Sequence, residues 1–153
     1  MTVVVQTESF DLNNTLYQMK RNNSSIGAAV SFIGFVRDVV SKNETEELTS
    51  LFLEHYPGMT EKSLLAIENM ARERWDLEDV FIVHRIGRLN LNDPIVGVIV
   101  LSKHRKNAFE SCAFIMDYLK TEAPFWKKET TNQQSYWVDM IESDSIMKLR
   151  WEK

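Results

Sequence analysis

The sequence has few of the features that build cross-linked, secreted or membrane-spanning proteins. Its 153 residues include one cysteine, Cys112, so no disulfide can form within the chain. A lone cysteine fits the reducing cytoplasm. The longest apolar runs, such as residues 95–101, are far shorter than the ~20 residues that cross a bilayer. The first residues lack a basic segment followed by a long apolar stretch, so we expect no signal peptide and a cytoplasmic location without membrane contact.

Signatures of nucleotide, hydrolase and metal chemistry are also missing. The five glycines form no GxGxxG fingerprint, no Walker loop and no nucleophile elbow, so neither nucleotide-driven chemistry nor a hydrolase fold is indicated. His55, His84 and His104 show no metal-ligand spacing, and we therefore predict no metal and no cofactor. Cys112 follows the apolar pattern of its neighbours and is interpreted as a core residue.

The charge is negative overall but unevenly distributed. The net charge is −4, which argues against a nucleic-acid-binding surface, since such surfaces are usually basic. Between residues 103 and 128, however, six lysines and arginines stand against three acidic residues. A local basic region on an acidic chain indicates a small anionic ligand or an acidic partner.

Hydrophobic periodicity predicts an α+β fold in one domain, residues 1–153, since no repeat or linker divides the chain. We expect strands at 2–6, 27–36, 48–55, 80–85, 95–102, 125–129 and 136–138. We expect helices at 11–21, 59–75 and 105–121, the last two being the main ones. Residues 37–47 are predicted to form an exposed, mobile loop, and 87–94 a turn-rich connection. Consecutive strands with short connections favour a mostly antiparallel sheet.

Lys120 is the strongest local signal for chemistry. If Phe109 marks the centre of the apolar face of helix 105–121, Lys120 falls about 20° from it, at 100° per residue. The alternative is a purely structural role, in which the lysine interacts with the helix C-terminus and its amine reaches water.

Lys127 follows after the helix-breaking Ala123-Pro124 pair. If the chain reverses there, two partly desolvated ammonium groups can approach each other, and this would hold the pKa of at least one of them down. Such a pair could act in acid–base or nucleophilic chemistry, or bind anions. A solvated basic turn is the commoner arrangement.

Three further basic residues could bind an anion. Arg37 follows a strand, where a guanidinium can bind phosphate. His104 and Arg105 begin the second long helix, whose N-terminus favours negative charge. Arg105 and Lys120 are, however, ~22 Å apart along a continuous helix. Either the helix is broken, or a neighbouring subunit contributes His104 and Arg105; we favour the second, which predicts a homodimer with an interface near residues 100–106.

Five motifs in this order resemble the large-subunit family of molybdopterin synthase. The long ones are residues 53–62 (LEHYPGMTEK) and 114–129 (FIMDYLKTEAPFWKKE). The short ones are 34–37 (GFVR), 83–87 (VHRIG) and 102–105 (SKHR). The resemblance extends over residues 27–138. Two ungapped motifs of ten and sixteen residues are highly specific.

The resemblance implies a hammerhead-type α/β domain that forms a homodimer within a heterotetramer. A small sulfur-carrier subunit would insert its C-terminal Gly-Gly thiocarboxylate, and sulfur would pass to cyclic pyranopterin monophosphate, forming the dithiolene of molybdopterin. Lys120 and Lys127 would be the catalytic residues. The implied substrate-binding residues are Phe35, Val36, Arg37, His104, Arg105, Lys128 and Glu129.

Two other functions stay open. A non-catalytic module that binds a phosphorylated metabolite or an acidic tail would have the same basic region. Single-stranded nucleic-acid binding through Phe125, Trp126 and the lysines is less favoured, and would require a strongly salt-dependent affinity.

Overall fold

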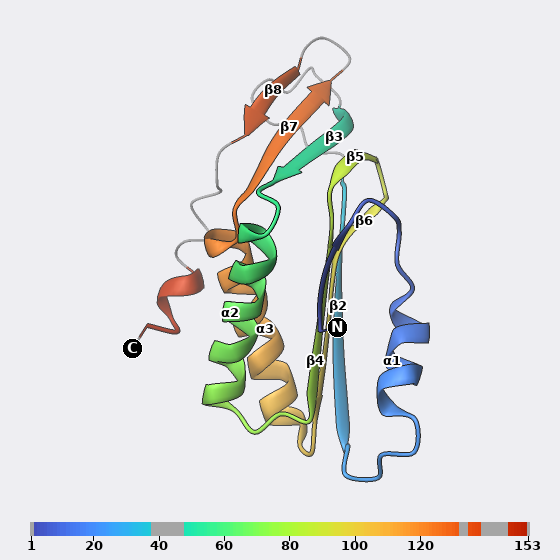
Figure 1. Ribbon diagram of the computed structural model, residues 1–153, viewed down its shortest axis with the longest axis vertical. Helices are drawn as coiled ribbons and strands as arrows, with labels where there is room; N and C mark the ends of the chain where they lie inside the picture. Colours follow the sequence, from blue (N-terminus) through green and yellow to red (C-terminus); the bar gives the residue numbers. More distant parts are fainter. Residues whose placement is uncertain (1, 38–47, 132–134, 139–146, 153) are drawn as a thin grey trace.

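The structure is a computed structural model that describes residues 2–37, 48–131, 135–138 and 147–152 (Figure 1). For residues 48, 49, 126–131 and 135–138 the description covers the backbone alone.

The described chain forms eight strands and three helices, and the expected α+β class is confirmed. The strands are β1 (Val3–Gln6), β2 (Ala28–Phe35), β3 (Leu48–His55), β4 (Asp79–Arg85), β5 (Gly87–Asn90), β6 (Pro94–Ser102), β7 (Phe125–Thr131) and β8 (Ser135–Val138). The helices are α1 (Leu12–Lys20), α2 (Met59–Arg74) and α3 (Arg105–Glu122). As expected, α2 and α3 are the two main helices.

The strands divide between two four-stranded sheets. Sheet A has the order β1-β4-β6-β2, and sheet B has the order β5-β3-β7-β8. Among the described strand pairs only β1 with β4 is parallel, so the predicted antiparallel character is confirmed. Sheet B extends past the ends of α2 and α3 at the top of Figure 1.

Sheet A forms the centre of a three-layer arrangement, with α2 and α3 on one face and α1 on the other (Figure 1). Strand β6 is buried on both faces, which explains its unbroken apolar sequence. Val96, Val98 and Val100 pack toward α2 and α3. Ile99 and Leu101 pack in the cluster that includes residues of α1.

The prediction of a turn-rich connection at 87–94 is wrong in part, because β5 occupies the first half of this segment. Leu89 lies opposite Leu51 of β3 and is fully buried. Gly87 has a φ of 82°, which glycine adopts without strain, so a new strand starts two residues after β4 ends. The turn itself follows, where Asn92 has a φ of 71°. Of the loop predicted at 37–47, all but Arg37 lies outside the described residues.

Candidate active site

Helix α3 places Lys120 on its exposed face, so the prediction that Lys120 lies on the centre of the apolar face is wrong. Phe109, chosen to mark that face, is 63% exposed. Lys120 is ~140° around the helix from the fully buried Ile115. The buried residues of α3 are Ala108, Ser111, Cys112, Phe114, Ile115 and Leu119. The polar Ser111 fits among them because its hydroxyl donates to the carbonyl oxygen of Asn107 at 2.6 Å.

Lys127 is the third residue of β7, and its Cα lies opposite that of Leu53 in β3. The chain does not reverse between the two lysines, because β7 continues away from the end of α3 (Figure 1). The helical conformation ends at Ala123, whose φ and ψ of −78° and 129° are those of extended backbone. The side chains of Lys127, Lys128 and Glu129 lie outside the description, so the lysine pair stays a prediction.

Two side chains from other elements, Thr60 and His84, contact the junction between α3 and β7. The Thr60 hydroxyl, at the start of α2, donates to the carbonyl oxygen of Pro124 at 3.1 Å. The Tyr56 backbone N–H donates to the same hydroxyl at 3.0 Å. The ring of Phe125 stacks on His84, with 3.7 Å between centroids and 18° between planes. Pro124 and the first residue of β7 are thus attached to α2 and to sheet A.

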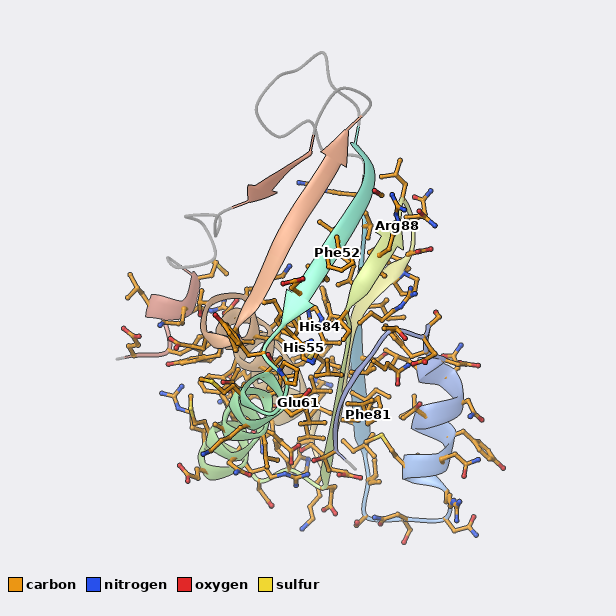
Figure 2. All side chains as sticks on the ribbon, turned by 45° about the horizontal axis from the view of Figure 1, so that its top comes forward. Phe52, His55, Glu61, Phe81, His84 and Arg88 are labelled. Carbon is orange, nitrogen blue, oxygen red and sulfur yellow. The ribbon has the colours of Figure 1, made fainter. Side chains whose placement is uncertain are left out.

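A second group of polar residues lies beside this junction, where β3 ends and α2 begins (Figure 2). The Nε2 atom of His55 is 3.5 Å from Oε1 of Glu61. The other carboxylate oxygen of Glu61 accepts a hydrogen bond from the Gly58 backbone N–H at 2.6 Å. One carboxylate therefore caps α2 and pairs with a histidine of β3.

Phe35, Val36 and Arg37 follow the end of β2. Phe35 and Arg37 are exposed, whereas Val36 is buried with the apolar residues beneath sheet B. The Val36 N–H donates to the carbonyl oxygen of Asp93 at 2.9 Å. This fixes the backbone at the point from which Arg37 leaves the sheet.

His104 and Arg105 are exposed at the start of α3, at the opposite end from Lys120. Helix α3 is unbroken from Arg105 to Glu122, which excludes one of the two explanations offered for the separation of these residues. Arg105 and Lys120 are thus ~22 Å apart in one chain. Within a single copy, the structure therefore does not bring His104 and Arg105 close to Lys120.

Thr60 and His84 were missed as site residues by sequence reasoning. The two bonded residues Thr60 and Pro124 are separated by 64 positions, so no local spacing could reveal the contact. The only signal was indirect: both Thr60 and His84 lie inside motifs of the family resemblance.

A metal site, a membrane-spanning helix and a reactive cysteine are not supported in the part of the chain that the structure describes. No three His, Cys, Asp or Glu side chains gather there to hold a metal, and no helix there is long and apolar enough to cross a bilayer. Burial raises the pKa of the Cys112 thiol to about 11. The thiolate is the nucleophilic form of cysteine, so this buried thiol stays protonated at neutral pH and is a poor nucleophile there.

Comparison with known proteins agrees with the family that the motifs resemble. The family model described as "MoaE protein" matches residues 5–122. The molybdopterin synthase catalytic subunit of Vibrio cholerae is 51% identical, over 98% of this chain and 97% of the relative. A solved MoaE protein from Burkholderia ambifaria is 48% identical, covers 99% of this chain and 98% of its own, and superposes with a TM-score of 0.83.

A more distant solved structure agrees as well. The molybdopterin synthase of Staphylococcus aureus is 31% identical, covers 91% of this chain and 98% of its own, and has a TM-score of 0.80. The expected family is therefore confirmed, and the chain belongs to the MoaE family, that of the molybdopterin synthase catalytic subunits.

Proposed function

We propose that this chain transfers sulfur from the C-terminal thiocarboxylate of a small ubiquitin-like carrier to cyclic pyranopterin monophosphate, forming the dithiolene of molybdopterin. The observation that carries the proposal is identity near one half, along essentially the whole chain, to relatives named molybdopterin synthase catalytic subunit. A catalytic subunit implies another subunit, and the sulfur carrier is the partner we assign. We place this activity in the cytoplasm and assign it to one domain, residues 1–153.

Lys120 and Lys127 are the proposed catalytic residues. Transfer from a thiocarboxylate develops negative charge on oxygen and requires proton delivery, and ammonium groups can supply both without a metal or nucleotide. Lys120 lies in the last turn of α3 and Lys127 in β7, either side of the junction described above. Both reactants are anions, which suits the basic region in this chain of net charge −4.

The proposed pocket is composite, with Phe35, Arg37, Lys128 and Glu129 from one copy and His104 and Arg105 from a second copy. Val36, which is buried, contributes by holding the backbone between Phe35 and Arg37. Strand β2 favours such pairing of two copies. It is an edge strand of sheet A, has no charged residue, and leaves Phe32, Ile33 and Phe35 at 41%, 39% and 56% exposure. Edge strands without charge or proline readily pair with another chain.

Antiparallel pairing of β2 with the same strand of a second copy would complete the site. If the two strands pair over their full length, Phe35 lies opposite Ala28 of the second copy. Ala28 is itself the register partner of Ser102, which is two residues before His104. The start of the second copy's α3 then approaches the end of β2 that bears Arg37. With one carrier on each catalytic subunit, the assembly is a heterotetramer.

The test is reconstitution from purified components. The protein is mixed with thiocarboxylated carrier and cyclic pyranopterin monophosphate, and dithiolene product is measured. The control carrier ends in an ordinary carboxylate. Product formed only with the thiocarboxylate is the expected result. Binding of both components without product would instead favour the alternative, a non-catalytic module that binds a phosphorylated metabolite or an acidic tail.

A further inference from the structure

The junction between α3 and β7 controls how the two proposed catalytic lysines are placed relative to each other. Lys120 lies three residues before Ala123, and Lys127 lies three residues after Pro124. Helix and strand are each stiff over such short lengths, so a change of backbone direction at residues 123–124 displaces one lysine relative to the other. Pro124 restricts its own φ but leaves ψ to be set by its surroundings.

Thr60 binds the Pro124 carbonyl group from the start of α2. Its side chain is fully buried, and its hydroxyl makes two hydrogen bonds, accepting from the Tyr56 N–H and donating to the Pro124 oxygen. A buried hydroxyl that uses both its donor and an acceptor position has little freedom to turn. The orientation of the Pro124 peptide group is thereby tied to α2.

His84 supports the next residue, Phe125, from sheet A. The histidine is 6% exposed, and its Nδ1 atom is 2.7 Å from the Arg85 carbonyl oxygen. Because a carbonyl oxygen only accepts, Nδ1 carries the proton in this contact, and the ring orientation is set. Phe125 stacks on that ring, and its backbone is the register partner of His55 in β3.

We infer that Thr60, His84 and Phe125, here called the junction cluster, are positioning residues that set the separation of Lys120 and Lys127 for sulfur transfer. Two elements distant in sequence, α2 and β4, contact the consecutive residues Pro124 and Phe125 between the lysines. Neither α2 nor β4 supplies a lysine of the pair. The inference rests on the proposed function. It concerns placement, for which an error of about 1 Å can cost on the order of 100-fold in rate.

Substitution pairs at Thr60 separate a positioning role from simple support of the fold. Thr60→Val keeps the shape and removes both hydrogen bonds, whereas Thr60→Ser keeps the hydroxyl. We expect Thr60→Val to lower kcat in the reconstituted reaction by about 10-fold to 100-fold, with KM for the carrier changed less than about 3-fold. Thr60→Ser should recover kcat to within about 3-fold of the unsubstituted protein.

Phe125 provides a second pair that does not depend on the first. Phe125→Leu removes the stacked ring and should lower kcat in the same way, whereas Phe125→Tyr keeps the ring and should not. Val80→Ala is the matched control, since Val80 is buried near the start of β4, opposite Val100 and four residues before His84. All variants are assayed well below their unfolding midpoints, with the folded fraction checked by circular dichroism.

The outcomes separate this inference from the proposed function. Lys120→Ala and Lys127→Ala are assayed alongside. If the lysine variants are inactive while Thr60→Val and Phe125→Leu turn over within about 2-fold of the Val80→Ala control, the positioning role is overturned and the proposed function stands. If the lysine variants turn over normally, the assignment of the two amines fails, and the positioning role fails with it.

Discussion

His104 and Lys120 lie at opposite ends of one unbroken helix, α3. Both belong to the basic region of the sequence, yet no pterin-sized ligand could contact both within one copy. The composite pocket proposed above explains this arrangement. His104, at the start of α3, contributes to the pocket of a second copy, and Lys120, at the end of α3, contributes to the pocket of its own copy.

A mixing experiment tests whether the pocket is shared. Lys120→Ala and Arg105→Ala should each be inactive alone. In a hybrid dimer with shared pockets, one site contains both defects and the other contains none. After subunit exchange, an equimolar mixture should therefore regain about one quarter of full activity. If both residues act within the same copy, every site contains one defect and the mixture stays inactive.

Strand β2 is expected to form the contact between copies. Ile33→Lys places a charge on this uncharged edge and should convert the dimer to a monomer, since lysine on an edge opposes strand pairing. Sedimentation velocity measures the change. Tyr17→Lys is the control, because Tyr17 is 72% exposed on α1, which is not part of sheet A. A dimer that survives Ile33→Lys undiminished would place the interface elsewhere.

Cys112 predicts a loss of stability at alkaline pH. Burial raises the pKa of its thiol from 9.0 to about 11 in the folded chain, so between these values the unfolded chain loses a proton that the folded chain keeps. Stability is therefore full below pH 9 and falls as the pH rises toward 11, by about 2 to 3 kcal/mol at ~1.4 kcal/mol per pKa unit. Urea unfolding of the protein and of Cys112→Ala measures the effect. The difference between the two proteins should shrink across this range, and a constant difference would contradict the account.

The C-terminal segment is expected to stabilise α2 and α3. The Trp151 ring lies 5.5 Å from Phe114 and 5.7 Å from Trp75, centroid to centroid, and its Nε1 donates to Asp117 at 2.6 Å. Trp151→Ala should lower the free energy of unfolding by about 2 kcal/mol, less than for a fully buried aromatic. Arg150→Ala also removes a contact with Asp117, but the arginine side chain of this ion pair is 45% exposed, and its loss should cost less than about 1 kcal/mol. Equal, small losses in chemical denaturation would show that the segment does not support the helices.

Much of the fold could be predicted because the main elements have strong periodic patterns. The unbroken apolar sequence of β6 and the helical spacing in α2 each determine an element from local residues alone. β5 could not be predicted in this way. Its four residues include one buried side chain, Leu89, and its strand conformation depends on pairing with β3, which is distant in sequence.

The error at Lys120 has a similar physical origin. A helical wheel reports which residues share a face, but it does not report which face meets the sheet. Phe109 is large and apolar, so its sequence pattern predicts it at the centre of the buried side. In the structure it is exposed, while the small Ala108 and Ser111 are buried. The junction contacts of Thr60 and His84 likewise arise from tertiary packing, which no local pattern contains.

The central claim is that the amines of Lys120 and Lys127 both take part in sulfur transfer, and single-turnover kinetics tests it most directly. Carrier thiocarboxylate and cyclic pterin are mixed with excess Lys120→Ala, Lys127→Ala or, as control, Lys62→Ala, whose lysine is exposed on α2. The account predicts at least a ~100-fold lower rate for the first two, with carrier affinity retained, and an unchanged rate for the third. Sulfur transfer at the normal rate in either Lys120→Ala or Lys127→Ala would contradict it.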